Sequence, residues 1–359
     1  MKKILLILMM FLFINHVKAI STSAFSAILM DMDNNVVLYE KNIHNVRSVA
    51  SISKIMTAVL AIESGKLDDV VVVDDVISGA YGSAIYIQSG EELTLRDLVY
   101  GLMLRSGNDA ALVIAKYVGG NVNHFVEMMN NKASEIGMKN SNFNNPHGLD
   151  VDNGNYSTAY DMAILTSYAM KLDEYRKITG TKSYKLKTNK NSYLWKNKNK
   201  LLKMYKYTTG GKTGFTDIAR RTLVSTASKD NINLVAVTLN DGNDFLDHKN
   251  LFEYGFSNYT NLEIIKKGNI SIYDEYYNDF ELYTDVDFNY IVNNNDDVSV
   301  LLKYELEKKR EFDDGDIVGN LIVILNGSEI HRQNIFVKVD NKVKESVFDK
   351  TINWFKNIF

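Results

Sequence analysis

Ser51 and Lys54 are three residues apart in a stretch whose other side chains are apolar or small. Within residues 48–62 the apolar side chains recur at the spacing of one helix face. Positions i and i+3 are neighbours on a helix surface, so the hydroxyl and the amine lie side by side. Lys54 is the only charged residue of this stretch, and burial of a lone ammonium lowers its pKa. A neutral amine beside a hydroxyl is a base beside its nucleophile.

Two further short motifs follow in the chain. Ser106-Gly107-Asn108 lies in a predicted loop after an apolar helical run, and Lys212-Thr213-Gly214 opens a run of strand-like segments. The pattern Ser-x-x-Lys alone is weak, because a chain of this length contains it by chance. The three motifs in this order are, however, the signatures of penicillin-binding proteins and serine β-lactamases. Their order therefore favours catalysis over a chance match.

The composition is that of an ordinary globular protein. With 359 residues, 45% of them hydrophobic and 24% charged, the chain has the length for two domains. The formal net charge is −3, so nothing indicates nucleic acid as a partner. Cysteine is absent and the six histidines form no spaced set of ligands. The sequence therefore predicts no disulfide, no metal site and no cofactor.

One region of the chain is strongly basic, and aromatic residues alternate with its lysines. We expect a solvated hairpin face there, with attraction to anionic wall polymers as the alternative. The region contains Lys182, Lys185, Lys187, Lys190, Lys196, Lys198, Lys200, Lys203 and Lys206, interleaved with Tyr184, Tyr193 and Trp195.

Residues 1–19 have the pattern of a secretory signal peptide. Lys2 and Lys3 precede an uncharged apolar run at 4–14, and small residues stand at the positions that signal peptidase recognises. The run is shorter than the roughly 20 residues that cross a bilayer as a helix, although an uncleaved anchor is the alternative. We therefore expect an exported protein at the cell wall or the outer face of the cytoplasmic membrane, with a mature chain that begins near Ile20.

Residues 20–258 are predicted to form one α+β domain. Apolar runs predict a hairpin within 25–39 and strands within 215–239, while the region between them has helical spacing. Strands from both ends that flank a helical insert favour one antiparallel sheet covered by helices. Short alternating strands within 259–345 predict a small all-β domain.

Residues 346–359 are predicted to form a short amphipathic helix. Phe348, Ile352, Phe355 and Phe359 share one face, and charged and amide side chains lie largely on the other. The helix is too short to span a bilayer. We expect it to lie in a membrane interface, with docking on the β domain as the alternative.

Longer stretches around the motifs resemble the low-molecular-mass penicillin-binding proteins. More narrowly, they are similar to the serine D-alanyl-D-alanine carboxypeptidases of Gram-positive, spore-forming bacteria. The resemblance runs from about residue 25 to residue 259 and continues more weakly through the β domain and the tail. The matching stretches are Ala50–Thr57, Leu104–Ala111, Asn145–Leu149, Tyr156–Ala163 and Lys212–Thr216.

The resemblance implies a penicillin-recognising fold of the β-lactamase and transpeptidase type. It also implies an enzyme that removes the terminal D-alanine from peptidoglycan stem peptides. Ser51 would attack the carbonyl carbon between the two D-alanines, Lys54 would accept its proton, and Ser106 would relay that proton to the leaving D-alanine. β-Lactam antibiotics would acylate Ser51 too, because they imitate the D-alanyl-D-alanine end.

The resemblance further implies which residues hold the substrate. Asn108 would bind a substrate amide or steady Lys54, and Lys212 and Thr213 would bind the terminal carboxylate. Gly214 would let the substrate approach the strand closely. The backbone N–H groups of Ser51 and Phe215 would form the oxyanion hole, a device whose loss typically costs about 100- to 1,000-fold in turnover per donor.

Each assignment has a structural alternative. Ser106 and Asn108 also suit a turn that caps the next helix, and Lys212 also suits the solvent face of a strand. His147 lies in a sequence that favours a shaped loop over chemistry. Arg220 follows Ala219 where the resembling proteins usually have glycine, a residue that often serves a backbone angle that arginine adopts only at a cost.

Three rival functions share the motifs. A class A β-lactamase needs a Glu-x-x-x-Asn loop, and residues 127–131 fit that pattern but fall inside a predicted helix. A transpeptidase or endopeptidase would share every motif and differ only in the molecule with which the acyl-enzyme reacts. A degenerate member of the family would be a wall-binding or scaffold protein, and the intact motif residues argue against it.

Overall fold

The computed structural model describes residues 20–150, 154–308 and 312–339. Contacts divide these residues into two compact units. The first holds residues 20–29, 39–227 and 235–254, and the second holds 30–38, 228–234 and 255–339. The predicted signal peptide at 1–19 and the predicted helix at 346–359 lie outside the described residues. Within the described part of the chain, no helix has the length and apolar character to cross a membrane.

An antiparallel sheet of five strands contains the residues of the third motif. Its order is β2-β1-β11-β10-β9, so strands from before and after the helical region pair in one sheet, as predicted. The strands are β1 (Ser26–Asp31), β2 (Val37–Lys41), β9 (Thr208–Thr216), β10 (Arg220–Lys229) and β11 (Ile232–Leu239). Every residue of β1 is buried, which explains why its sequence is almost continuously apolar.

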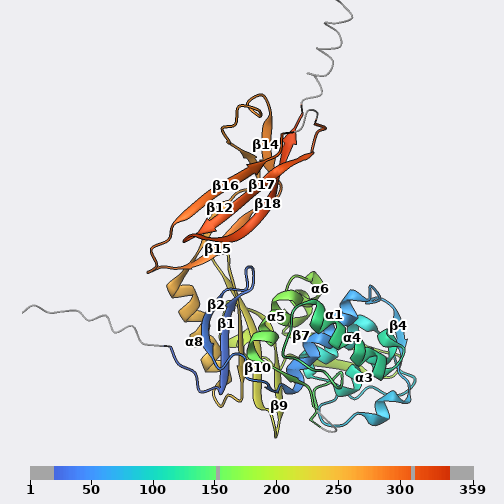
Figure 1. Cartoon of the computed structure of the whole chain (residues 1–359). Coiled ribbons are helices and arrows are strands. Elements are labelled where there is room, and N and C mark those ends of the chain that lie inside the picture. The colour runs from blue at the N-terminus through green and yellow to red at the C-terminus, as the bar shows by residue number, and fades with distance from the viewer. Residues whose placement is uncertain (1–19, 151–153, 309–311, 340–359) are drawn as a thin grey trace, which may run out of the picture. The chain divides into compact units, whose positions relative to one another are not determined.

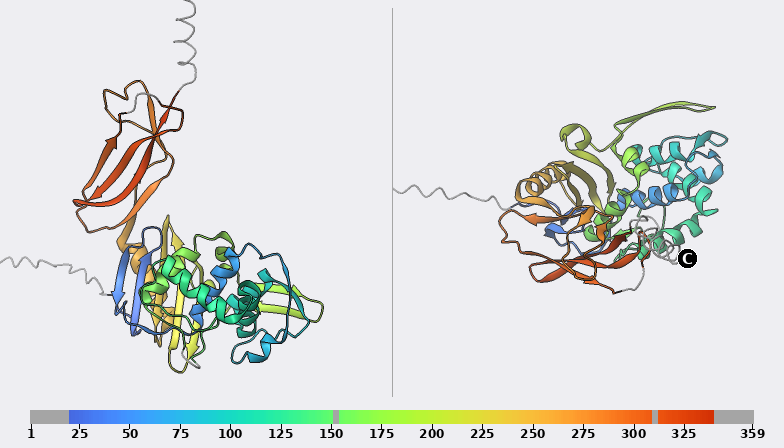
Figure 2. Two further views of the ribbon diagram at one scale, coloured as in Figure 1. Left: turned by 45° about the vertical axis from the view of Figure 1, so that its right-hand side comes forward. Right: turned by 90° about the horizontal axis from the view of Figure 1, so that it is seen from above.

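Most helices come between β2 and β9 in the sequence, and in Figures 1 and 2 they gather at one side of the sheet. The turn η1 (Ala50–Ser53) contacts β9 and leads into α1 (Lys54–Glu63). Residues 54–61 of α1 are all buried, as expected for a helix without a polar face. The other helices and turns before β9 are η2 (Asp75–Gly79), α2 (Leu95–Tyr100), η3 (Gly101–Arg105), α3 (Asn108–Gly119), α4 (Val122–Glu135), α5 (Ala159–Ala169), α6 (Asp173–Gly180) and α7 (Leu201–Met204).

Short strand pairs lie within the helical region, and one further helix follows the sheet. Helix α8 (Asp244–Asn258) comes after β11. The pairs are β3 (Arg47–Ser48) with β6 (Tyr156–Ser157), β4 (Val70–Val72) with β5 (Glu92–Thr94), and β7 (Ser183–Lys187) with β8 (Ser192–Lys196). The β7–β8 pair is the basic hairpin, and its lysines are exposed as predicted. Two of its aromatic side chains pack against the rest of the domain. Tyr184 stacks on Tyr100 of α2 at 3.8 Å between ring centroids, and Trp195 is buried.

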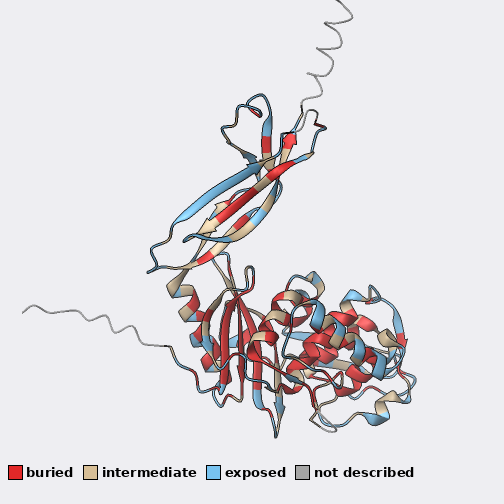
Figure 3. Ribbon diagram, in the orientation of Figure 1, coloured by how far each residue is buried: buried red, intermediate tan, exposed pale blue. Residues whose placement is uncertain are grey.

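The second unit is all β beyond α8. Its larger sheet has the order β13-β14-β18-β17-β16, and β12 pairs with β15 separately. An apolar core that includes Val318, Val323, Ile335 and Val337 lies within this unit, and Figure 3 marks these buried stretches in red. The strands are β12 (Tyr259–Ile265), β13 (Gly268–Ile270), β14 (Glu281–Thr284), β15 (Phe288–Asn293), β16 (Val300–Leu306), β17 (Ile317–Leu325) and β18 (Ser328–Lys338). The predicted all-β region is therefore confirmed, while the domain boundary after residue 258 stays a prediction.

Candidate active site

Ser51 lies in the tight turn η1, directly before α1. The preceding residue, Ala50, has a left-handed φ of 51°, which an L-residue adopts only at a cost. The hydroxyl of Thr222 on β10 donates to the carbonyl of Val49 at 3.0 Å and holds the start of this turn. A β-carbon on Gly214 would lie 3.0 Å from the Ser51 nitrogen. Position 214 therefore requires glycine, because β9 runs close to the backbone nitrogen of Ser51.

The amine of Lys54 is enclosed by three oxygen acceptors. It lies 3.0 Å from the Ser51 hydroxyl and 2.7 Å from the side-chain oxygen of Asn108, and it also donates to the carbonyl of His147. Lys54 is completely buried. Burial, followed by the charges of Lys212 and Lys198, lowers the pKa of Lys54 well below its usual value. The surroundings thus favour the neutral amine, which is the form that accepts a proton.

Ser106 and Lys212 form a second hydroxyl–amine pair. Ser106 ends η3 with a left-handed φ of 65°. Lys212 on β9 donates to the Ser106 hydroxyl at 3.0 Å and to the Thr213 carbonyl at 2.6 Å, and it is 1% exposed. Burial, followed by the charge of Lys198, lowers the pKa of Lys212 to about 7. The solvent-facing alternative for Lys212 is therefore wrong.

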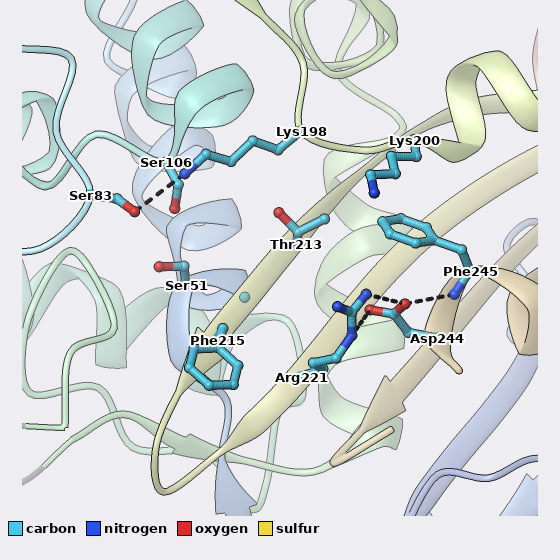
Figure 4. Close-up of a pocket in the computed structure, with 11 residues that line it drawn as sticks. Ser51, Ser83, Ser106, Lys198, Lys200, Thr213, Phe215, Arg221, Asp244 and Phe245 are labelled. Atoms are coloured by element: carbon cyan, nitrogen blue, oxygen red, sulfur yellow. Dashed lines mark hydrogen bonds and ion pairs between the residues drawn. The ribbon is translucent and has the colours of Figure 1, made fainter. Parts of the chain in front are cut away.

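A third lysine faces the same cleft. The amine of Lys198 lies 3.3 Å from the Ser83 hydroxyl, and Figure 4 shows it extending toward Ser106. Burial, followed by the charge of Arg105, lowers the pKa of Lys198. Nothing in the sequence places Lys198 at the cleft, because it is one of nine lysines in the basic region. Only the fold shows that Lys198 is partly buried there while other lysines of the region are exposed.

A carboxylate behind the second motif holds one wall of the cleft. Asp109 accepts hydrogen bonds from the backbone N–H groups of Ile85 at 3.0 Å, Tyr86 at 2.7 Å and Ile87 at 3.4 Å. Asn108 adds two contacts to the same loop, through its backbone N–H to the Ser83 carbonyl and through its side chain to the Tyr81 carbonyl. Residues 81–87 are thus fixed by Asn108, the last residue of the second motif, and by Asp109, which follows it.

The loop around His147 supports the catalytic turn with its backbone. The carbonyl of Pro146 accepts from the Thr57 hydroxyl at 2.6 Å, next to the carbonyl that binds Lys54. A β-carbon on Gly148 would lie 2.0 Å from the Ala50 carbonyl oxygen. Burial and then the charge of Lys54 lower the pKa of the His147 imidazole to about 3. The loop interpretation of His147 therefore agrees with the geometry, although the sequence carried no signal for the role of its carbonyl.

The cleft itself has a volume of about 360 Å³ and lies between the helices and the edge of β9. Ser51, Ser106, Thr213 and the exposed Phe215 line it, and Figure 4 shows these side chains around one hollow. Its far end is formed by Lys200, Arg221, Asp244 and Phe245, which the sequence analysis did not single out. The structure thus brings the three predicted motifs together at one cleft. Within the described ranges, no cluster of His, Cys, Asp and Glu suits a metal ion.

Two family models match the chain. One is described as D-alanyl-D-alanine carboxypeptidase and matches residues 14–243, which is more than half of the chain. The chain belongs to this family. The second model is the C-terminal domain of penicillin-binding protein 5 and matches residues 259–345. The family predicted from the motifs is therefore confirmed, together with the all-β C-terminal domain.

Curated relatives carry the same family name. D-alanyl-D-alanine carboxypeptidase DacF of Bacillus subtilis is 39% identical over 218 residues, which cover 59% of this chain and 56% of that protein. The alignment thus spans little more than half the length of DacF. DacA of Haemophilus influenzae is 31% identical over 353 residues, with 91% of this chain and 87% of that protein covered.

Solved structures confirm the fold. Penicillin-binding protein 5 of Haemophilus influenzae superposes with a TM-score of 0.73 at 29% identity, covering 89% of this chain and 98% of that one. A mutant of the Streptomyces K15 DD-transpeptidase superposes with a TM-score of 0.62 at 31% identity, covering 66% and 99%. The α+β penicillin-recognising fold predicted from the motifs is therefore correct.

Proposed function

We propose that this chain is a serine D-alanyl-D-alanine carboxypeptidase that removes the terminal D-alanine from peptidoglycan stem peptides. The observation that carries the proposal is the buried Lys54 amine, which lies 3.0 Å from the hydroxyl of Ser51, a residue that lines the cleft. The names of its relatives support the substrate class.

Acylation is the first half of the proposed reaction. Ser51 Oγ attacks the carbonyl carbon between the two D-alanines while its proton passes to Lys54 Nζ. The developing oxyanion lies between the backbone N–H groups of Ser51 and Phe215. The C–N bond then breaks, and the proton reaches the leaving nitrogen through the Ser106 hydroxyl. Free D-alanine departs, and the shortened stem peptide remains as an ester on Ser51.

Deacylation reverses these proton movements with water in place of the leaving amine. Lys54 takes a proton from the water molecule while the water oxygen attacks the ester carbon. That proton then returns to Ser51 Oγ as the ester bond breaks. The products are the shortened peptide and the free serine. No cofactor takes part in either half, since hydrolysis needs only a nucleophile, a base and an oxyanion hole.

Four residues are proposed to bind the substrate. Asn108 steadies Lys54 through the 2.7 Å contact and lies next to the substrate amide. Lys212 and Thr213 act at the terminal carboxylate, and Gly214 lets the substrate strand approach β9. β-Lactams would enter the same cleft and acylate Ser51.

The rival functions have less support. Glu127, the candidate deacylating residue of a β-lactamase, lies on α4 with its side chain 70% exposed and bound to His124. It therefore does not line the cleft. Burying an amine is costly. A scaffold protein without activity would gain nothing to offset the cost of a buried lysine beside a serine hydroxyl.

A paired assay tests the proposed function. The protein and its Ser51→Ala variant are incubated with a fluorescent penicillin and, separately, with diacetyl-L-lysyl-D-alanyl-D-alanine. The proposal expects stable labelling and D-alanine release, both lost in the variant. Rapid turnover of the penicillin without D-alanine release would instead indicate a β-lactamase. Absence of both signals would leave the scaffold function.

We also propose that the protein is exported, loses residues 1–19, and associates with a membrane surface through residues 346–359. The support is the sequence of these segments, with its charged start, apolar run and amphipathic end. Flotation with lipid vesicles, comparing the whole chain with one that ends at residue 345, tests the second part. Equal flotation of the two proteins would contradict it.

A further inference from the structure

The outer face of the basic hairpin carries lysines that the proposed reaction does not use. Successive side chains of a strand point to opposite sides of a sheet. On one side of the β7–β8 pair every second residue is exposed, and Figure 2 shows the hairpin at the outside of the domain. We call this side the lysine face, and it consists of the cross-strand pairs Ser183–Lys196, Lys185–Leu194 and Lys187–Ser192.

The positive charge of the lysine face is not compensated locally. Residues 182–206 contain nine lysines and neither Asp nor Glu, in a chain whose formal net charge is −3. Among the described residues, no carboxylate forms an ion pair with Lys185, Lys187 or Lys196. The other residues of the chain are therefore acidic overall, and positive charge is concentrated at this hairpin.

Two acidic side chains contact the hairpin, and both bind hydroxyl groups rather than lysines. Glu91 is fully buried and accepts from the Thr188 hydroxyl at 2.6 Å and from the Tyr193 hydroxyl at 3.1 Å. Asp97 accepts from the Tyr184 hydroxyl at 2.6 Å. These contacts hold the hairpin against the domain and leave its lysines charged and free for a partner. Because the backbone beneath the lysine face is already ordered, binding there costs less conformational entropy.

The three lysines of the face form a row. Lys196 lies opposite Ser183 in the register, so it stands one level before Lys185, and Lys187 stands one level after. Each level spans two residues, or about 7 Å along the strands. Lys196 precedes the cleft residue Lys198 by two positions, so one end of the row lies beside the cleft. Such a row matches the regularly repeated charges of a linear polyanion.

The composition of the lysine face favours a polyanion in solution over a membrane. A segment that lies in a lipid interface inserts apolar and aromatic side chains. Leu194 is the one apolar residue of this face, whereas Trp195 is buried and Tyr184 stacks on Tyr100. The face also lacks arginine, whose planar fork suits carboxylates, while lysine binds phosphate as a point charge. Phosphodiester groups are therefore the anions that fit best.

We propose that the lysine face binds a linear cell-wall polymer with phosphodiester groups in its backbone. Such binding would hold the catalytic domain on the wall, with the cleft beside the bound polymer. The inference goes beyond the proposed function and does not depend on Ser51, while the wall as the place of binding rests on the proposed export. The attraction is electrostatic, so binding releases counterions and weakens as salt rises.

Titration with a purified glycerol phosphate polymer, free of lipid, tests the assignment. The affinity of the whole protein is measured at several salt concentrations. A triple variant with Lys185→Gln, Lys187→Gln and Lys196→Gln is expected to bind on the order of 10- to 100-fold more weakly at low salt. The slope of log affinity against log salt should become shallower by about 2, as expected when three phosphate contacts are lost.

A matched triple variant removes the same charge elsewhere. Lys139, Lys171 and Lys249 are exposed and lie outside the hairpin, so their replacement by Gln should leave the affinity within a few-fold of the wild type. Replacement of the three lysines of the face by Arg keeps the charge and should retain most of the binding. All variants should release D-alanine from diacetyl-L-lysyl-D-alanyl-D-alanine as the wild type does, because none of these lysines lines the cleft. Thermal unfolding verifies that each variant folds.

Four results would overturn the assignment. They are no binding of the polymer by the wild type, equal weakening in the two Gln variants, and equally tight binding of polygalacturonate, whose charges are carboxylates. The fourth is binding to vesicles of phosphatidylglycerol and phosphatidylcholine that needs the three lysines and exceeds binding to the polymer, which would assign the face to a membrane. A wild type that binds the polymer through these lysines but releases no D-alanine would overturn the proposed function alone.

Discussion

The Lys54 amine lies 3.0 Å from the Ser51 hydroxyl and is completely buried, with Lys212 and Lys198 as its cationic neighbours. Burial and like charge both disfavour an ammonium. Lys54 therefore has the surroundings of a base, although its three oxygen acceptors would suit a charged amine. The proposed role of the amine, to accept the proton of Ser51, explains why a lysine is buried here despite the energetic cost.

Loss of the base should slow acylation strongly without unfolding the protein. Lys54→Met replaces the amine with an apolar side chain of similar length. We expect acylation by penicillin to slow by about 100- to 10,000-fold, the usual contribution of a general base. Rates come from the time course of fluorescent labelling. Lys203→Met, at an exposed position of α7, is the control and should label normally. Labelling of Lys54→Met within a few-fold of the wild type would refute this role.

The charge of Lys198 should set the pH at which acylation begins. Lys54 accepts a proton only when neutral, and the positive charge of Lys198 helps to lower its pKa. Lys198→Met removes that charge, so the pKa of Lys54 rises and the acid limb of the acylation profile moves to higher pH. Lys198→Arg keeps a charge and should keep the profile close to that of the wild type. An acid limb that stays in place in Lys198→Met would rule out this electrostatic role.

The Asp109 clamp should hold the cleft wall. In Asp109→Asn one carboxylate oxygen becomes an amide nitrogen, which cannot accept the backbone N–H groups of residues 85–87. A buried donor left without an acceptor typically costs about 1–3 kcal/mol, so the free energy of unfolding should fall by that amount. Urea denaturation measures the fall, and limited proteolysis should cut the variant within residues 81–87. Asp75→Asn, which alters one 3.1 Å contact to Ser89 in an exposed setting, is the control. Equal stability of the two variants would count against the clamp.

Arg220 carries a backbone angle that suits glycine. Its φ is 60°, and a left-handed conformation typically costs an L-residue about 1–2 kcal/mol. Arg220→Gly should therefore raise the free energy of unfolding by about 1 kcal/mol, after the greater freedom of glycine in the unfolded chain is allowed for. Arg220→Ala keeps the β-carbon and should not gain this stability. Equal gains in both variants would assign the effect to the side chain.

The motif residues were predictable because their chemistry limits the residue types. Ser51, Lys54, Ser106, Asn108 and Lys212 were each expected at the cleft, and the structure brings them together. The backbone angle at Arg220 was also expected, since glycine is usual there in the resembling proteins. The order of the strands in the five-stranded sheet was not expected, because pairing of distant strands depends on packing between segments far apart in the chain.

Other parts of the site left little signal in the sequence. The carbonyl of His147 contributes through the backbone, so its side chain does not reveal it. Arg221 and Asp244 are 23 residues apart, and only the path of β10, β11 and α8 brings them together. Asp109 follows the second motif directly, but the sequence did not reveal its role, because the three N–H groups that it accepts lie 22 to 24 residues earlier in the chain.

Mass spectrometry of the penicilloyl-enzyme tests the central claim most directly. The protein is incubated with benzylpenicillin, digested, and searched for the peptide that carries the added mass. The account predicts one adduct, on the Ser51 hydroxyl, and none in Ser51→Ala. An adduct on another serine, or one that persists in Ser51→Ala, would contradict the claim that Ser51 is the nucleophile.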